Sequence, residues 1–255
     1  MTNSVHVLAV LQHSHALLTE AAAPLLPDAV TKPSYASEWS IAQVLSHLGS
    51  GAEIFTRFLV AGSTSAGPPE RADMVAIWNE WGAKSPARQV TDSLAANTNF
   101  LERVGELTSG QVESFRVGMF VGEVDLAGFL VVRLGEHAVH TWDVRVALDP
   151  TATIPEDAAE LLLPRLSEIA SRSGKEGDAD LSVAVRTTDP EREFSLRVSR
   201  EGVQLVNGTL GEASLRLPAE ALVRLVYGRM DARHTPPLEA DGVDLDQLRS
   251  VFPGF

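Results

Sequence analysis

Three side chains of this sequence have the types and the spacing to bind one divalent metal ion. Glu136 and His140 stand four residues apart, so on a helix they share one face, one turn apart. A third ligand must come from another segment, and His47 lies within an apolar helical stripe that contains Val44 and Leu48. Two imidazoles and one carboxylate suit zinc or a similar ion, and three protein ligands leave a coordination position open. An open position is typical of a catalytic metal site.

The same residues also have simpler interpretations. A Glu-x-x-x-His pair is a short motif with low specificity, and such pairs often lie on solvated helix surfaces. A histidine on an apolar stripe is commonly a core residue with a local hydrogen-bond partner. The spacing alone therefore leaves both a metal site and an ordinary helix surface open.

Helices must position these residues, and the first 150 residues contain four amphipathic segments with helical periodicity. Their predicted ranges are 5–26, 41–59 behind a capping box of Ser40 and Gln43, 70–107 with a break near Ser85-Pro86, and 122 or 123 to 148. Four such segments joined by loops predict a four-helix bundle, and bundles hold their ligands in the interior between facing helices.

The pattern changes after Pro150. Alternation of apolar and polar residues predicts half-buried strands, and these are flanked by helices. The predicted strands are 181–187, 194–199, 202–206 and 214–217, and the predicted helices are 156–173, 218–227 and 245–251. We therefore predict an α+β protein of two domains, a helical bundle over 1–150 and a small α+β domain with a mostly antiparallel sheet over 151–255.

Composition restricts the partners. The chain has 255 residues, 34 acidic and 21 basic side chains, a formal charge of −13 and no cysteine. An acidic surface argues against binding to nucleic acid or to an anionic membrane. Without cysteine there is no disulfide, no thiolate ligand and no thiol nucleophile from the protein. Because there is also no basic signal segment and no apolar run of membrane-spanning length, we expect a cytoplasmic protein.

The residues around the three candidate ligands resemble the signatures of a known family. Glu38-Trp39-Ser40 followed by Val44-Leu45-Ser46-His47-Leu48 resembles the Trp-[Ser/Thr] … His-Leu signature of the DinB-like mycothiol-dependent maleylpyruvate isomerase family. The segment 133–143 resembles its second signature, Glu-x-x-x-His-x-Trp-Asp. The C-terminal region, including 219–229, is similar to the domain appended in this family, so the resemblance covers nearly the whole chain.

The resemblance implies a DinB-like bundle that binds a divalent metal, usually zinc, through His47, Glu136 and His140. It also implies a low-molecular-weight thiol, mycothiol, as cosubstrate. The metal would favour the thiolate, which would attack a small electrophilic substrate, either to isomerise it or to transfer the thiol to it. In the family an arginine of the C-terminal domain can reach the anionic substrate, and Arg229 is the best match, with Arg224 as the second. The simpler interpretation is an arginine that interacts favourably with the dipole at a helix C-terminus.

Other residues near the candidate ligands keep more than one interpretation. Asp143 shares their helix face, so it could orient a ligand imidazole, contact substrate, or pair on the surface with Arg133 or Arg145. Arg133 could balance a carboxylate or be solvated.

We expect Trp39 and Trp142 to pack near the site. His137 points about 100° away from Glu136 on a helix, so we do not expect it to be a ligand.

Two other functions stay open at this point. A hydrolase would use the same open metal position with water in place of a thiol. A non-enzymatic module would enclose a small ligand between its elements.

Overall fold

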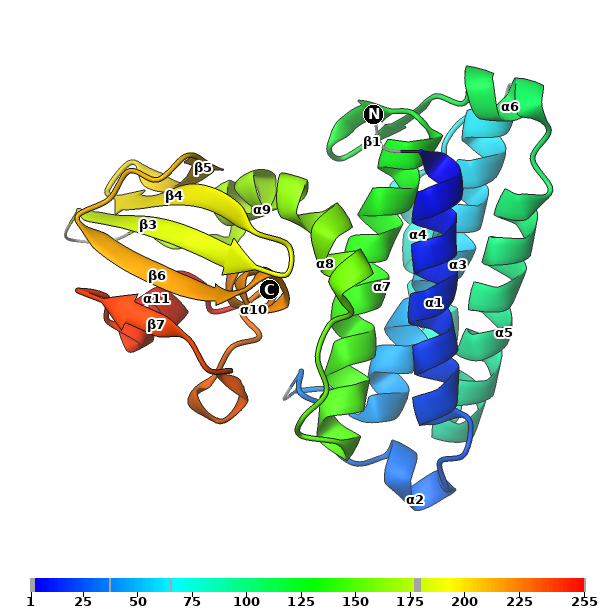
Figure 1. The fold of residues 1–255 in the computed structure, drawn as a ribbon. Helices are drawn as coiled ribbons and strands as arrows, with labels where there is room; N and C mark the ends of the chain where they lie inside the picture. Colours follow the sequence, from blue (N-terminus) through cyan, green and yellow to red (C-terminus); the bar gives the residue numbers. More distant parts are fainter. Residues whose placement is uncertain (1–2, 37, 65, 177–179, 255) are drawn as a thin grey trace. The chain divides into compact units, whose positions relative to one another are not determined.

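The structure is a computed structural model that describes residues 3–36, 38–64, 66–176 and 180–254. It divides into two compact units, Met1–Ala152 and Thr153–Phe255, which we call the bundle and the C-terminal unit. In the described part of the bundle the strands are confined to one small hairpin and the other elements are helices. The C-terminal unit contains a mixed five-stranded sheet with helices (Figure 1). The α+β class with two domains, predicted from the sequence, is confirmed.

The long helices of the bundle lie side by side (Figure 1). Helix α3 packs against α5 and α7, and α1 packs against the same two helices. The long helices are α1 (Ser4–Ala22), α3 (Ile41–Ser63), α5 (Pro86–Gly105) and α7 (Leu126–Leu148). The shorter ones are α2 (Pro27–Val30), α4 (Arg71–Gly82), which packs on α3, and α6 (Ser109–Ser114).

Local sequence explains where these helices begin. The predicted capping box is present, because the Ser40 side chain accepts from the Gln43 amide and the Gln43 side chain accepts from the Ser40 amide. Helix α5 begins at Pro86, whose missing N–H costs nothing in the first helical turn. The break predicted near Ser85-Pro86 is therefore confirmed.

The start of α7 differs from the prediction. Strands β1 (Val117–Met119) and β2 (Gly122–Val124) form an antiparallel hairpin, so the backbone of 122–124 is used in strand pairing. Gly122 has a φ of +101°, a conformation that favours glycine. The helix begins only after Asp125, whose side chain accepts a hydrogen bond from the Gly128 amide.

Side chains from α3, α5 and α7 meet in an apolar interior at one end of the bundle, together with Phe115, which follows α6. The Phe129 ring is fully buried and lies with its centroid 5.3 Å from that of Phe55, 6.2 Å from Phe100 and 5.3 Å from Phe115. Such tilted aromatic contacts add to the free energy gained from burying apolar surface. This packing fixes α7 against its neighbours.

The sheet of the C-terminal unit has the strand order β5-β4-β3-β6-β7. Among the strands that the structure describes, only the β3–β6 pair is parallel and the other three pairs are antiparallel, so the mostly antiparallel sheet is confirmed. Its strands are β3 (Leu181–Thr188), β4 (Arg192–Ser199), β5 (Gly202–Asn207), β6 (Ala213–Pro218) and β7 (Glu239–Asp241), the last of which was not predicted.

The helices of this unit cover the apolar side of the sheet, where Val183, Val185 and Leu215 are buried. Helix α9 contacts β5, and α10 contacts β3 and β6. The helical elements are α8 (Glu156–Leu162), η1 (Leu163–Arg165), α9 (Leu166–Ser173), α10 (Ala219–Val226), η2 (Ala232–His234) and α11 (Leu245–Val251). The single helix predicted over 156–173 is interrupted at Pro164, which cannot donate a helical hydrogen bond.

Within the described residues, no helix combines the length and the apolar character needed to cross a membrane.

Candidate metal centre

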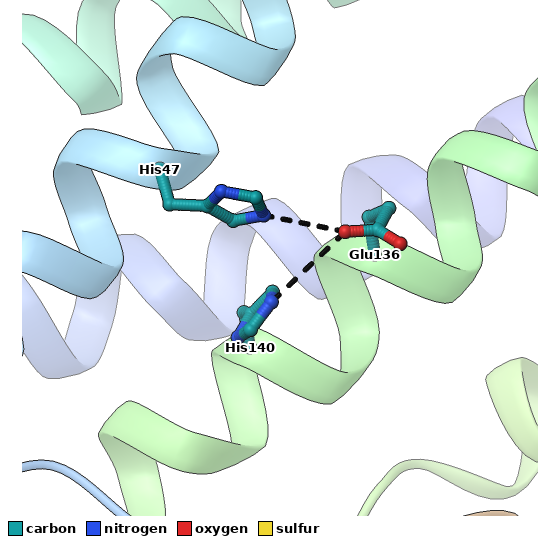
Figure 2. A group of neighbouring side chains, drawn as sticks. All are labelled: His47, Glu136 and His140. Carbon is teal, nitrogen blue, oxygen red and sulfur yellow. Dashed lines mark hydrogen bonds and ion pairs between the residues drawn. The ribbon is translucent and has the colours of Figure 1, made fainter. Parts of the chain in front are cut away.

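Two helices of the bundle bring His47, Glu136 and His140 together, and we call these three residues the donor set (Figure 2). His47 comes from α3, and the other two come from successive turns of α7. One ligand atom from each residue lies within 4.8 Å of the other two. His47 Nε2 is 3.3 Å and His140 Nε2 is 4.0 Å from Glu136 Oε2. A divalent ion of the zinc type fits a donor set of two imidazole nitrogens and one carboxylate oxygen.

The donor set is partly open to solvent. The exposed fraction of the side chain is 33% for His47, 44% for Glu136 and 12% for His140. A small molecule can therefore reach these atoms, which a closed structural site would not allow.

Electrostatics favour the protonation states that a metal requires. Burial lowers the pKa of His47, and this exceeds the opposite effect of its hydrogen bond with Glu136, so the imidazole is neutral at neutral pH. Burial raises the pKa of Glu136. The hydrogen bond with His47 and the neighbouring cationic groups together lower it by more, so the pKa falls to about 2. A neutral imidazole and an ionised carboxylate are the forms that bind metal.

Asp143 fixes the orientation of His140. The Nδ1–H of His140 donates to Asp143 Oδ2 over 2.8 Å, and this leaves Nε2, the atom that faces Glu136, with a free lone pair. Asp143 is fully buried, so the interpretation as a helix-surface aspartate is wrong. A direct role of Asp143 in catalysis stays a prediction.

Comparisons with known proteins agree with this geometry. The family model described as "Mycothiol maleylpyruvate isomerase N-terminal domain" matches residues 11–145, which is more than half of the chain. The chain belongs to this family. The match contains all three residues of the donor set.

Two solved structures extend the similarity beyond the family domain. One is a crystal structure of the mycothiol-dependent maleylpyruvate isomerase, with 14% identity and a TM-score of 0.68. The other is a histidine-to-alanine mutant of the mycothiol-dependent maleylpyruvate isomerase, with 13% identity and a TM-score of 0.70. Each alignment covers 93% of this chain and 92% of that chain. At this identity the similarity shows that the fold is shared. No curated protein sequence matches the chain significantly.

Two tryptophans predicted near the site occupy different environments in this member of the family. Trp39 is 37% exposed, and its ring centroid is 5.3 Å from that of His47 and 6.1 Å from that of His140. Trp142 is buried, and its Nε1 donates to the Ala152 carbonyl over 2.8 Å. Trp39 therefore lies against both imidazoles, and Trp142 belongs to the core.

The other histidines of the bundle do not join the donor set. His137 is buried, with Nδ1 2.8 Å from Ser14 Oγ, in agreement with the expectation that it is not a ligand. His15 is also buried and contacts Thr98, whereas His6 and His13 are exposed.

Sequence reasoning missed one polar residue beside the site. Asn97 of α5 is buried and accepts a hydrogen bond from Arg133, which is itself only 1% exposed, so the interpretation of Arg133 as solvated is wrong. A signal was present, because Gln89, Ser93 and Asn97 recur every four residues along α5 and all three are buried.

The two arginines considered for the substrate lie in the C-terminal unit. Arg224 forms two hydrogen bonds of 2.7 Å to the carboxylate of Glu220 and both side chains are buried, so its guanidinium already serves an internal pair. Arg229 is 9% exposed, and its Nη1 donates to the Tyr227 carbonyl over 2.7 Å. Contact between Arg229 and substrate stays a prediction.

Proposed function

We propose that this protein is a divalent-metal-dependent thiol S-transferase or isomerase, with zinc as the metal and mycothiol as the thiol. The observation that carries the proposal is the donor set, in which two helices place three suitable ligand atoms within 4.8 Å. The partial exposure of these residues supports an open coordination position. Family membership and the shared fold with a mycothiol-dependent isomerase support the choice of thiol.

Each residue has one task in this proposal. The donor set would hold the ion, and Asp143 would keep His140 in the tautomer that binds it. A bound dication would supply Lewis acidity, which favours the thiolate of a cosubstrate over the thiol. Because the chain has no cysteine, the attacking sulfur must arrive with the cosubstrate. Arg229 would pair with an anionic group of the substrate.

The proposed reaction is an addition at an activated carbon. The sulfur forms a C–S bond to a cis double bond conjugated to a carbonyl, and the π electrons move onto the carbonyl oxygen. Rotation about the resulting single bond follows. The electrons then return, the C–S bond breaks, and the double bond forms again in the trans configuration. In a transferase the C–S bond remains, and the product is a thioether formed by proton uptake or by loss of a leaving group.

Metal analysis of purified protein tests the site. We expect about one equivalent of zinc in the wild type and a large loss in His47→Ala and Glu136→Ala, because each variant removes a ligand. His6→Ala is the matched control, since this histidine is exposed and lies outside the donor set. Unchanged metal content in both ligand variants would contradict the proposal.

A thiol-consumption assay tests the reaction. Mycothiol is incubated with panels of electrophiles, including maleylpyruvate, with zinc present or chelated. We expect thiol-dependent turnover that chelation abolishes. Turnover of esters or amides without thiol would favour the hydrolase instead. A wild type that binds no metal but retains a small ligand would favour the binding module.

A further inference from the structure

A buried arginine lies behind the donor set. Arg133 stands on α7 one turn before Glu136 and is 1% exposed. Burial lowers the pKa of its guanidinium to about 10, which still leaves it charged at neutral pH. Burying a charge is costly, so its retention in a helical core requires specific compensation.

That compensation comes from two other helices. Arg133 Nη2 donates to the Leu48 carbonyl of α3 over 2.8 Å and to Asn97 Oδ1 of α5 over 2.7 Å. Its guanidinium also lies 5.4 Å from the ring centroid of Phe55. One planar group thus joins α7 to α3 and to α5.

Helix α3 is shaped to receive this group. A Cβ atom at Gly51 would lie 2.7 Å from Arg133 Nη1, so any larger residue there would displace the guanidinium. Gly51 is one turn after His47, and Leu48 follows His47 directly. The contacts of Arg133 therefore fall on the turn of α3 that carries the ligand.

We propose that Arg133, received by Gly51 and Asn97, is a positioning residue that holds the His47 helix at a fixed distance and rotation relative to the Glu136 helix. This inference rests on the proposed metal-dependent function. Two of the three ligands share α7, so the geometry of the donor set depends on how α3 is placed against it. Arg133 keeps that placement in the absence of metal, and the ligands are thus preorganised.

Variants that keep the positive charge at position 133 test positioning without removing the charge itself. Gly51→Ala moves the guanidinium, and Arg133→Lys removes its planar fork. Gly62→Ala is the matched control, because it also inserts a Cβ into α3, 2.4 Å from the buried Phe115 ring, far from His47. Both variants replace a glycine of α3 by a better helix former, and the gain is larger at Gly51 in the helix interior than at Gly62 near the C-terminal end.

The full chain is stripped of metal and titrated with Co²⁺, and the visible absorption reports the geometry of the ligands. We expect Gly51→Ala and Arg133→Lys to bind Co²⁺ roughly tenfold more weakly with an altered spectrum. Gly62→Ala should lower the melting temperature and leave both the affinity and the spectrum unchanged.

Three outcomes would overturn the inference. Wild-type affinity and spectrum in both charge-conserving variants would show that Arg133 does not position the ligands. An equal loss in Gly62→Ala would show that general destabilisation is the cause. If the wild type gave no Co²⁺ absorption, or if His47→Ala gave the same absorption as the wild type, both the proposed function and the inference would be overturned. The first two outcomes overturn the inference alone. Thermal unfolding without metal verifies that each variant is folded.

Discussion

The bundle and the C-terminal unit bury polar groups in different ways. In the bundle, His15, Ser93, Arg133 and His137 each keep one buried side-chain atom without a hydrogen-bond partner in the protein. In the described part of the C-terminal unit no buried side-chain nitrogen or oxygen lacks a hydrogen-bond partner. Glu220, for example, accepts two hydrogen bonds from Arg224.

This difference separates two uses of polar residues. An unsatisfied buried polar group costs about 1–3 kcal/mol, so the bundle accepts a loss of stability in the interior that also contains the donor set. Native proteins generally accept such violations at functional sites. In the described part of the C-terminal unit the buried polar side chains are paired, so this cost is absent there. The bundle is thus the part whose interior departs from optimal stability.

The largest expected effect comes from breaking the pair in the C-terminal unit. Glu220→Gln would leave the Arg224 guanidinium buried beside a neutral amide, so we expect the free energy of unfolding to fall by about 3–5 kcal/mol. Urea unfolding followed by circular dichroism measures this change. The matched control is Glu193→Gln, whose partner Arg186 is 50% exposed, and its effect should stay below about 1 kcal/mol. Equal effects would show that burial of the Glu220–Arg224 pair does not make its loss more costly than the loss of an exposed pair.

In the bundle, the corresponding change should affect metal binding. Asp143→Asn can present an amide N–H to His140 Nδ1, which would stabilise the tautomer that carries its proton on Nε2. We expect zinc affinity to fall by about 10–100-fold, measured by competition with a chelator. Asp125→Asn on the same helix is the control, because asparagine still caps a helix. Unchanged affinity in Asp143→Asn would show that this contact does not orient the ligand.

Two buried serines allow a direct comparison of the units. Ser195 Oγ accepts from the Leu210 amide over 2.7 Å, so Ser195→Ala should cost about 1–3 kcal/mol of unfolding free energy. Ser93 Oγ has no partner, so Ser93→Ala should be neutral or stabilising by about 1 kcal/mol. Urea unfolding of both variants measures the difference. Equal destabilisation by the two substitutions would contradict the comparison.

The smallest effect concerns pH. Burial raises the pKa of Asp231. Hydrogen bonds from His234 and from backbone amides lower it by more, so the folded pKa lies below the ordinary value of about 3.9. Its contribution to stability is therefore present above that value and lost as the pH falls through the folded pKa. Asp231 is 39% exposed, and solvent screening keeps this contribution below about 1 kcal/mol.

Asp231→Asn tests this linkage in urea titrations between pH 7 and pH 2. The variant should be less stable than the wild type at neutral pH, and the difference should vanish in acid. A difference that is constant across this range would indicate that the carboxylate charge does not contribute.

Local rules predicted most of the bundle. Three features depend only on neighbours along the chain: the apolar periodicity, the helix starts at the Ser40 cap and at Pro86, and the shared face of Glu136 and His140. The apolar stripe around His47 suggested the pairing with this face, and the family resemblance supported it, because spacing alone says nothing about which helices face each other. The proximity of the three side chains is now a structural fact, and metal binding stays a prediction.

The features that the sequence did not predict depend on long-range contacts. Arg133 is charged and adjacent to a candidate carboxylate, so its burial depends on space left by Gly51 on another helix and on an acceptor from Asn97 on a third. The β1–β2 hairpin and the edge strand β7 are only three residues long, too short for alternation to identify them.

The position of Trp39 makes it an intrinsic fluorescence reporter of the donor set. Its indole is partly exposed to solvent and lies against the imidazoles of His47 and His140. A paramagnetic ion such as Cu²⁺ or Co²⁺ bound by the donor set would therefore be close enough to quench the fluorescence of Trp39. Loading and unloading of the centre can thus be followed in solution through the emission of a natural residue, without attaching a dye.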